Sequence, residues 1–346
     1  MSADASGDAV DDPVGYFLED MSYHGRSERT REAYERVLRE FETFAADRGV
    51  KIAEADHRSC LAYVHQLRER GVADSTIATY ASYLHRFYAY MSQVGAFDGN
   101  PMTLVMEELD ESVERNPTRR EIPLPAMRSF VADVAHPLDR AVVLTLLKTG
   151  MRVGELCNLD ARDVSMPSVS VGQTRPQLAE RGASLYVSPE PAVGERTNGE
   201  VRSASNKRKR ETILPMDDEL VDALRRWVAI RPDSRSPADP LFTSTTEWGA
   251  RLTPDAVGYL VRKHAERADW HRAGADASEN VTPHFFRHYF TTHLRDRTGE
   301  RGIVKYLRGD VADDIIDTYT HNWGNRVREV YEANIYRLVE RSEANA

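Results

Sequence analysis

The first hundred residues carry a single kind of hydrophobic pattern, and this constrains the fold more than any other feature of the chain. Apolar side chains recur at helical spacing in three runs, which start near Ser27, His57 and Asp74. Small polar or acidic residues stand at these starts, as is typical of helix N-termini. Asn100-Pro101 ends the pattern. The sequence therefore predicts an all-helical bundle over residues 13–100.

The remaining chain predicts a linker and a second domain of a different kind. Residues 101–120 are polar and charged, which is typical of a linker between domains. Residues 121–346 mix helical segments with three candidate strands, at 168–171, 184–187 and 211–214. Between the last two lies a segment rich in Pro, Gly, Ser and Asn, residues 188–206, which we expect to be a long mobile loop. The fold class is mainly α with a small antiparallel β-sheet.

Helical periodicity accounts for most of this second domain. A short helix is expected after Leu124-Pro125, and a strongly apolar helix ends at Gly150. Further helices are predicted at residues 219–230, 254–268, 283–297 and 324–340.

Composition is that of a soluble globular protein. Of the 346 residues 41% are apolar and 29% charged, and no apolar run approaches the ~18 residues that span a bilayer. The N-terminus lacks a signal-peptide pattern, and residues 1–12 are expected to form a disordered acidic tail. Cys60 and Cys157 match no metal-ligand spacing, which indicates reduced core cysteines in a cytoplasmic protein.

Net charge does not exclude a nucleic-acid partner. The chain carries −9, but residues 1–25 hold six acids and no Lys or Arg, so residues 26–346 carry only −3. Six lysines stand against 40 arginines. An acidic, arginine-rich chain resembles proteins of salt-adapted archaea, although a GC-rich genome would also favour Arg over Lys. High salt weakens the counterion-release part of DNA affinity, so an excess of basic residues would gain less there.

Arg152 is the first candidate for anion binding. It follows Gly150 and precedes Glu155 by three positions. A guanidinium group there is able to contact two phosphate oxygens, with the Glu155 carboxylate holding it in place. The alternative is a surface Arg–Glu pair on a helix, which would contribute little to stability.

His284 and Arg287 form the second candidate. They lie three residues apart, so on a helix they project from nearly the same face. Pro283 suits the first turn and Thr282 the N-cap, which places His284 where backbone N–H groups favour an anionic oxygen.

Zinc is an alternative use of the histidines on this segment. His284 and His288 are four apart, and His293 follows. No acidic residue stands between the first two, so the metalloprotease helix signature is absent. His288 and His293 are expected to pack or cap, and no metal or other cofactor is expected.

Lys207 and Lys209 are notable in a chain with six lysines. Lysine releases a proton far more readily than arginine, so either one is able to act as a general acid. The alternative is a solvated basic turn that contacts phosphates. Tyr319 stands out only because it follows the other candidates, and a tyrosine nucleophile needs nearby cations to neutralise the developing phosphorane charge.

These motifs, taken together, resemble those of the tyrosine recombinases, or phage-type integrases, a family that includes the Xer proteins. The resemblance covers roughly residues 13–340. It rests on four separated motifs: Thr149-Gly150-Met151-Arg152-x-x-Glu155-Leu156, a lysine before Leu214-Pro215, His284-x-x-Arg287-His288, and Tyr319-x-His321.

The resemblance implies a role for each residue. Arg152 and Arg287 would clamp the scissile phosphate, with Glu155 orienting Arg152. Tyr319 would be the nucleophile that forms a 3′-phosphotyrosyl link without metal or ATP. Lys207, or Lys209, would protonate the leaving 5′ oxygen. His284 would assist proton transfer, and His288 would support the site.

Two features depart from the family pattern. Asp310 stands where the family usually has a second histidine or tryptophan, and a carboxylate cannot donate to phosphate unless it is protonated. We expect Asp310 to orient a neighbour, or water or His321 to take over part of the missing role. The segment 188–206 is also longer than the usual family turn.

The resemblance also implies partners. The helical bundle would be the core-binding domain and residues 121–346 the catalytic domain, closing together on double-stranded recombination sites. A synaptic tetramer is implied, and no membrane partner. The last predicted helix would dock on a neighbouring protomer or pack in cis through its apolar face, formed by Val327, Val330, Tyr331, Ile335 and Leu338. Two alternative functions share this fold: a DNA-binding accessory protein with impaired catalysis, and a relaxase like the type IB topoisomerases.

Overall fold

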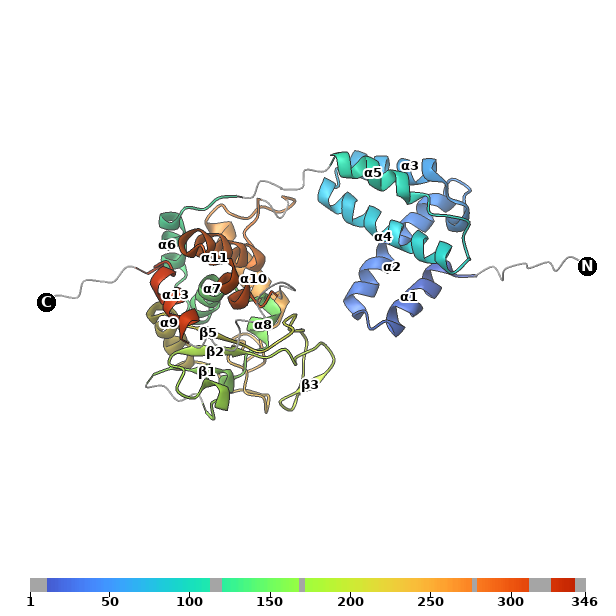
Figure 1. The fold of residues 1–346 in the computed structure, drawn as a ribbon. Helices are drawn as coiled ribbons and strands as arrows, with labels where there is room; N and C mark the ends of the chain where they lie inside the picture. Colours follow the sequence, from blue (N-terminus) through green and yellow to red (C-terminus); the bar gives the residue numbers. More distant parts are fainter. Residues whose placement is uncertain (1–10, 113–119, 168–171, 276–278, 311–324, 340–346) are drawn as a thin grey trace, which may run out of the picture. The chain divides into compact units, whose positions relative to one another are not determined.

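A computed structural model describes residues 11–112, 120–167, 172–275, 279–310 and 325–339 (Figure 1). The chain divides into two compact units, Met1–Pro117 and Thr118–Ala346. Each unit has its own hydrophobic core. No helix within the described ranges combines the length and apolar character needed to cross a bilayer.

The first unit is all-helical. Its elements are α1 (Pro13–Tyr23), α2 (Glu28–Ala46), the 3-10 turn η1 (Ile52–Glu54), α3 (His57–Glu69), α4 (Asp74–Gln93) and α5 (Met102–Ser112). The predicted start at Ser27 is confirmed, because its hydroxyl oxygen accepts from the Thr30 amide at 3.3 Å. Helix α4 begins at Asp74 itself, so the predicted cap lies in the first helical turn.

Most aromatic side chains of this unit lie in its core, as the helical pattern predicts. Phe41 packs edge-on against Tyr63, with ring centroids 5.2 Å apart, and Tyr88 donates its hydroxyl proton to the Ile52 carbonyl at 2.7 Å. The predicted stripe on α2 is buried throughout: Tyr34, Val37, Leu38, Phe41 and Phe44.

Two expectations about the ends of this unit are wrong in part. Helix α5 occupies much of the predicted linker, because Met102, Val105 and Leu109 form an apolar face that the surrounding acids obscure in the sequence. At the N-terminus, residues 1–10 lie outside the described residues, but Asp12 is ordered by specific contacts. Its carboxylate accepts from the Gly15 amide at 3.0 Å and pairs with Arg39 at 2.7 Å.

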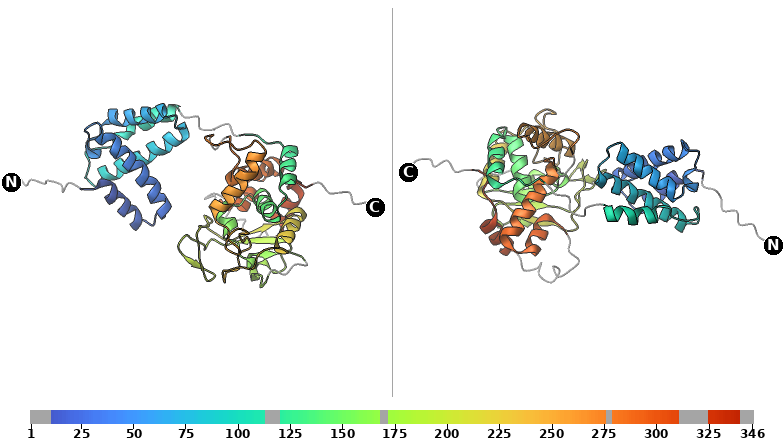
Figure 2. Two further views of the ribbon diagram at one scale, coloured as in Figure 1. Left: turned by 180° about the vertical axis from the view of Figure 1, so that it is seen from behind. Right: turned by 90° about the horizontal axis from the view of Figure 1, so that it is seen from above.

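The second unit combines helices with two small antiparallel sheets, as predicted. Its helices are α6 (Leu124–Asp133), α7 (Pro137–Thr149), α8 (Val153–Cys157), η2 (Ala161–Asp163), η3 (Pro176–Leu178), α9 (Asp218–Val228), α10 (Pro254–Arg267), α11 (Pro283–Thr298), α12 (Arg301–Arg308) and α13 (Arg326–Asn334). Its strands are β1 (Val164–Ser165), β2 (Ser184–Val187), β3 (Arg196–Thr197), β4 (Glu200–Val201) and β5 (Thr212–Pro215). In Figure 2 the three-stranded sheet lies to one side of the helices of this unit.

The larger sheet has the order β1–β2–β5, with Leu185 paired to both Val164 and Leu214. The predicted strand at 184–187 is confirmed, and β5 lies one residue later than predicted. Strand β1 was not predicted, because two residues carry no readable periodicity. The candidate strand at 168–171 lies outside the described residues.

The segment 188–206 is not a structureless loop. Strands β3 and β4 pair as a hairpin across Asn198-Gly199, where both residues have positive φ, 52° and 81°. An Asn-Gly pair is the usual signal of such a turn. Beyond it, the buried guanidinium group of Arg202 donates to the Asp160 carboxylate at 3.1 and 2.8 Å. These contacts pack the segment against the unit.

Helix α7 lies at the centre of the second core. Nearly all of its side chains from Leu138 to Thr149 are buried, including the ammonium group of Lys148, which lies 2.6 Å from carboxylate oxygens of both Asp217 and Glu219. The helix ends at Gly150 with φ of 61°. Any β-carbon at this position would lie 2.3 Å from the Phe290 ring, so only glycine fits.

The C-terminal segment packs in cis. Helix α13 ends at Asn334, earlier than predicted, because the extended residues that follow are held by backbone hydrogen bonds, including one from the Leu338 amide to Glu219 at 2.8 Å. The Tyr331 hydroxyl donates to the Lys148 carbonyl at 3.0 Å. The predicted apolar face therefore packs on this unit's own core, which is the cis alternative.

Substitution of Met102 by alanine tests whether α5 belongs to the first core. The side chain is fully buried, so its loss should lower the free energy of unfolding by about 2–5 kcal/mol. Leu104→Ala on the same helix is the matched control, because Leu104 is 55% exposed and should change stability little. Urea denaturation followed by circular dichroism measures both, and equal effects would contradict the assignment.

Candidate active site

Arg152 is held by the carboxylate predicted to hold it. It caps α8, and its backbone N–H donates to Glu155 Oε2 at 2.9 Å, while its side-chain Nη1 donates to Glu155 Oε1 at 3.0 Å. Glu155 is completely buried. The remaining terminal nitrogen of Arg152, Nη2, donates to Asp310 Oδ1 at 2.9 Å.

Arg287 approaches the same oxygen from α11. Thr282 caps this helix as predicted, with its hydroxyl accepting from the Phe285 amide. Arg287 Nη1 donates to the Gly150 carbonyl at 2.6 Å and to the Arg308 carbonyl at 3.0 Å, while Nη2 donates to Asp310 Oδ1 at 2.7 Å. Burial, and then the neighbouring charge of Arg152, lower the pKa of Arg287 to about 10. Both guanidinium groups thus converge on one anionic oxygen.

Asp310 is placed by the end of α12. Gly309 closes this helix in the left-handed conformation, with φ of 68°, and the Asp310 amide donates to the Lys305 carbonyl at 3.0 Å. Its second carboxylate oxygen, Oδ2, lies 3.1 Å from Arg308 Nε. The orienting role expected for Asp310 has a physical basis in these contacts, which involve three arginines.

Arg208 is a site residue that sequence reasoning missed. It lies between the exposed Lys207 and Lys209, yet its own side chain is buried. Arg208 Nη2 donates to Glu155 Oε2 and to the Leu307 carbonyl, both at 3.1 Å. The alternation Lys-Arg-Lys-Arg was the available signal, because in extended chain neighbouring side chains point to opposite sides.

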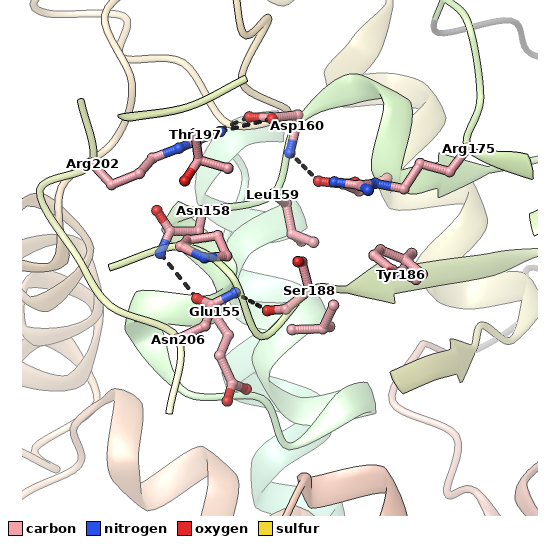
Figure 3. Close-up of a pocket in the computed structure, with 13 residues that line it drawn as sticks. Glu155, Asn158, Leu159, Asp160, Arg175, Tyr186, Ser188, Thr197, Arg202 and Asn206 are labelled. Carbon is pink, nitrogen blue, oxygen red and sulfur yellow. Dashed lines mark hydrogen bonds and ion pairs between the residues drawn. The ribbon is translucent and has the colours of Figure 1, made fainter. Parts of the chain in front are cut away.

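Lys207 is fixed by its neighbours on both sides. Arg208 anchors the following position, and Asn206 anchors the preceding one. The Asn206 amide group donates to the Ser188 carbonyl at 2.7 Å, and its oxygen accepts from Asn158 at 2.9 Å. Figure 3 shows these contacts at the edge of a polar pocket that Glu155 also lines.

The same pocket carries a buried group of balanced charges. Asp160 accepts from Arg202, and Arg251 Nη2 lies 2.6 Å from both Asp160 and Glu200 (Figure 3 shows the first pair). Buried charges persist only when paired in this way. The group anchors the β3–β4 hairpin, and with it the start of the segment that carries Lys207.

His284 and His288 lie together on the first turns of α11. Their Nε2 atoms are 2.8 Å apart, so one ring donates a proton and the other accepts it. His284 is exposed and His288 partly buried. In the described ranges, no three His, Cys, Asp or Glu side chains gather as a metal site would require. Tyr319 and His321 lie outside the described residues.

Comparisons with known proteins identify the family. Residues 15–95 match the phage integrase N-terminal SAM-like domain, and residues 194–326 match the phage integrase family. The tyrosine recombinase XerC of Pelotomaculum thermopropionicum is 26% identical over 326 residues, covering 88% of this chain and 91% of that protein. The tyrosine recombinase XerD of Shewanella oneidensis is 25% identical over 325 residues, covering 92% and 95%.

Solved structures share the fold. The Tn1549 transposon integrase, in complex with a circular intermediate DNA, aligns with a TM-score of 0.63 at 17% identity over 94% of this chain and 95% of that one. A lambda integrase dimer bound to a COC′ core site aligns with a TM-score of 0.58 at 14% identity over 87% and 95%. The chain belongs to the tyrosine recombinase, or phage-type integrase, family.

Replacement of Arg208 by methionine tests its anchoring contact. The change leaves the buried Glu155 carboxylate without one of its two guanidinium partners, so stability should fall by about 3–5 kcal/mol. Lys209→Met is the matched control, because Lys209 is exposed and should change stability little. Thermal and urea unfolding measure both. An Arg208→Met variant as stable as the wild type would show that Arg208 does not hold the site together.

Proposed function

We propose that the protein is a site-specific DNA recombinase that cleaves and rejoins duplex DNA through a covalent tyrosine–phosphate intermediate. One observation carries the proposal: Nη2 of Arg152 and Nη2 of Arg287 lie 2.9 and 2.7 Å from a single anionic oxygen. Guanidinium pairs of this kind bind phosphate oxygens with high directional specificity.

The proposed chemistry is a transesterification. The Tyr319 hydroxyl oxygen attacks the scissile phosphorus, a 3′-phosphotyrosyl bond forms, and the bond to the 5′ oxygen breaks. Arg152 and Arg287 neutralise the charge that develops on the non-bridging oxygens. Lys207 gives a proton to the leaving 5′ oxygen. His284 contacts the phosphate and takes up the proton that the Tyr319 hydroxyl releases, supported by His288. Attack by a new 5′ hydroxyl reverses these steps, so neither metal nor ATP is consumed.

Preorganisation explains why the framework of this site is buried. Glu155 fixes Arg152 before any substrate arrives, and the carbonyls of Gly150 and Arg308 fix Arg287. Held donors need no reorganisation when charge develops, which is the main source of electrostatic catalysis. The exposed Lys207, on a segment anchored at both neighbours, is suited to reach a nucleotide leaving group.

The finer assignments belong to the same proposal. Residues 13–100 would be the core-binding domain and residues 121–346 the catalytic domain, both contacting double-stranded recombination sites. A synaptic tetramer is supported by the likeness to a lambda integrase tetramer bound to a Holliday junction, with a TM-score of 0.57 at 15% identity. Six lysines against 40 arginines, with a net charge of −9, support a salt-adapted, archaeal setting, and two cysteines without metal-ligand spacing support a cytoplasmic one.

An accessory protein without cleavage activity is the second candidate. The observation that favours it is Asp310, whose carboxylate takes up the donors that a phosphate would need. The two candidates agree on DNA binding and differ in covalent chemistry.

Replacement of Tyr319 by phenylalanine separates these candidates. The substrate is a nicked duplex that carries a DNA site chosen by selection for binding to the wild-type protein. The wild type should form a covalent adduct on it, because loss of the short 5′ fragment prevents religation. Tyr319→Phe should bind equally and form none. Denaturing gel electrophoresis measures the adduct at several salt concentrations. Binding without any wild-type adduct would establish the accessory role, and relaxation of plasmids that lack the site would indicate a relaxase.

Sulfur substitution at the 5′ bridging oxygen tests Lys207 as the general acid. Lys207→Ala should slow cleavage of ordinary DNA by about 10²–10⁴-fold, the usual contribution of general acid catalysis. A thiolate leaves without protonation, so the same variant should cleave the sulfur-bridged substrate at nearly the wild-type rate. Lys209→Ala is the matched control and should show neither effect. If Lys209→Ala is the variant that cleaves ordinary DNA slowly and the sulfur-bridged substrate normally, Lys209 is the general acid.

A further inference from the structure

Asp310 occupies the anion position of the arginine clamp. Its Oδ1 accepts hydrogen bonds from Arg152 and Arg287, and its Oδ2 lies 3.1 Å from Arg308 Nε. We propose that Asp310 is an internal competitor for the phosphate site, which binds where a scissile phosphate oxygen binds and leaves when DNA phosphate enters. This inference rests on the proposed function of the clamp.

A second anion at the clamp would meet the charge of Asp310. Nη1 of Arg152 is taken by Glu155, and Nη1 of Arg287 by the carbonyls of Gly150 and Arg308. The other terminal nitrogen of each guanidinium group, Nη2, donates to Asp310. Each Nη2 carries a second N–H group, so a phosphate that binds there would lie directly against the Asp310 carboxylate. If both anions stayed, two like charges would lie in contact inside a partly buried site.

The two carboxylates of the site differ in how firmly they are held. Glu155 is fully buried and is bound by the Arg152 backbone, the Arg152 side chain and Arg208. The Asp310 side chain is 29% exposed, and among the described residues its carboxylate contacts the guanidinium groups of Arg152, Arg287 and Arg308. Within the described residues, rotation of this side chain toward solvent breaks no contact to backbone. Glu155 is therefore the permanent partner and Asp310 the exchangeable one.

Charge balance explains why the exchange needs an incoming anion. Three guanidinium groups face the Asp310 carboxylate, and that of Arg287 is buried, so departure of Asp310 alone would leave the Arg287 charge without its carboxylate partner. A phosphodiester replaces the lost negative charge as it enters. The clamp is thus closed to weak, isolated anions and opens to a phosphate whose binding is supported by other contacts along the DNA.

Phosphate binding by Asp310→Asn is the direct test. Asparagine keeps the shape of the side chain and removes its charge, so the clamp no longer carries a competing anion. The apparent dissociation constant for inorganic phosphate should fall by about tenfold or more, because the competent state is no longer a minor population. Phosphate-dependent thermal stabilisation of the full chain measures it, with chloride added to hold ionic strength constant.

Asp296→Asn is the matched control. Asp296 is 58% exposed on α11 and pairs with Arg295, so this variant changes net charge equally but lies outside the clamp. Its phosphate affinity should equal that of the wild type. Addition of Arg152→Gln to Asp310→Asn should abolish the gain, which locates the new binding in the clamp. Asp310→Ser serves as a second neutral variant if the asparagine form folds poorly.

Three outcomes would overturn the inference. Unchanged phosphate affinity in Asp310→Asn would show that no competition exists. Weaker affinity would make Asp310 a positioning residue that holds the arginines for phosphate. A gain that survives Arg152→Gln would place the binding elsewhere. Because these readouts involve neither DNA nor Tyr319, they remain distinct from the adduct assay, whose failure would instead remove the proposed recombinase activity.

Discussion

The buried Glu155 carboxylate is the interaction on which the site depends. It accepts hydrogen bonds from the Arg152 backbone, the Arg152 side chain and Arg208, and so joins the start of α8 to a segment that is far away in sequence. An unpaired carboxylate at this depth would be very costly, so the two segments are held together by the need to solvate one charge. The position of Arg152 in the clamp therefore follows from the requirement that the Glu155 carboxylate be paired.

The second unit uses the same device in its core. Lys148 brings together Asp217 and Glu219, and Glu219 in turn binds backbone N–H groups of the C-terminal segment. Hydrophobic packing alone would allow α13 to slide on an apolar surface. Paired charges with defined hydrogen bonds specify one register, at some expense in desolvation. Hydrophobic packing contributes most of the stability, and the buried ion pairs fix where the C-terminal segment lies.

Much of the fold could be predicted from local signals, and the failures share a physical cause. Helices such as α2, α7 and α11 have caps and apolar stripes that are visible in the sequence. Helix α5 was missed because acids surround its narrow apolar face, and α12 was not among the predicted segments. Among the site residues, Arg152 and Arg287 follow from family motifs. Arg208 does not: the alternation of lysine and arginine separates two sides of the chain, but which side is buried depends on a distant carboxylate.

Two buried arginines, Arg202 and Arg208, secure the segment before β5 at points six residues apart. A deletion of one residue between them would pull one of the two arginines away from its carboxylate partner. Before Arg202, the chain forms the β3–β4 hairpin, in which Asn198 donates to Asp160 and Glu200 pairs with Arg251. The separation of the two buried carboxylates, Asp160 and Glu155, therefore fixes the number of residues between Arg202 and Arg208. We expect no insertion or deletion in that segment.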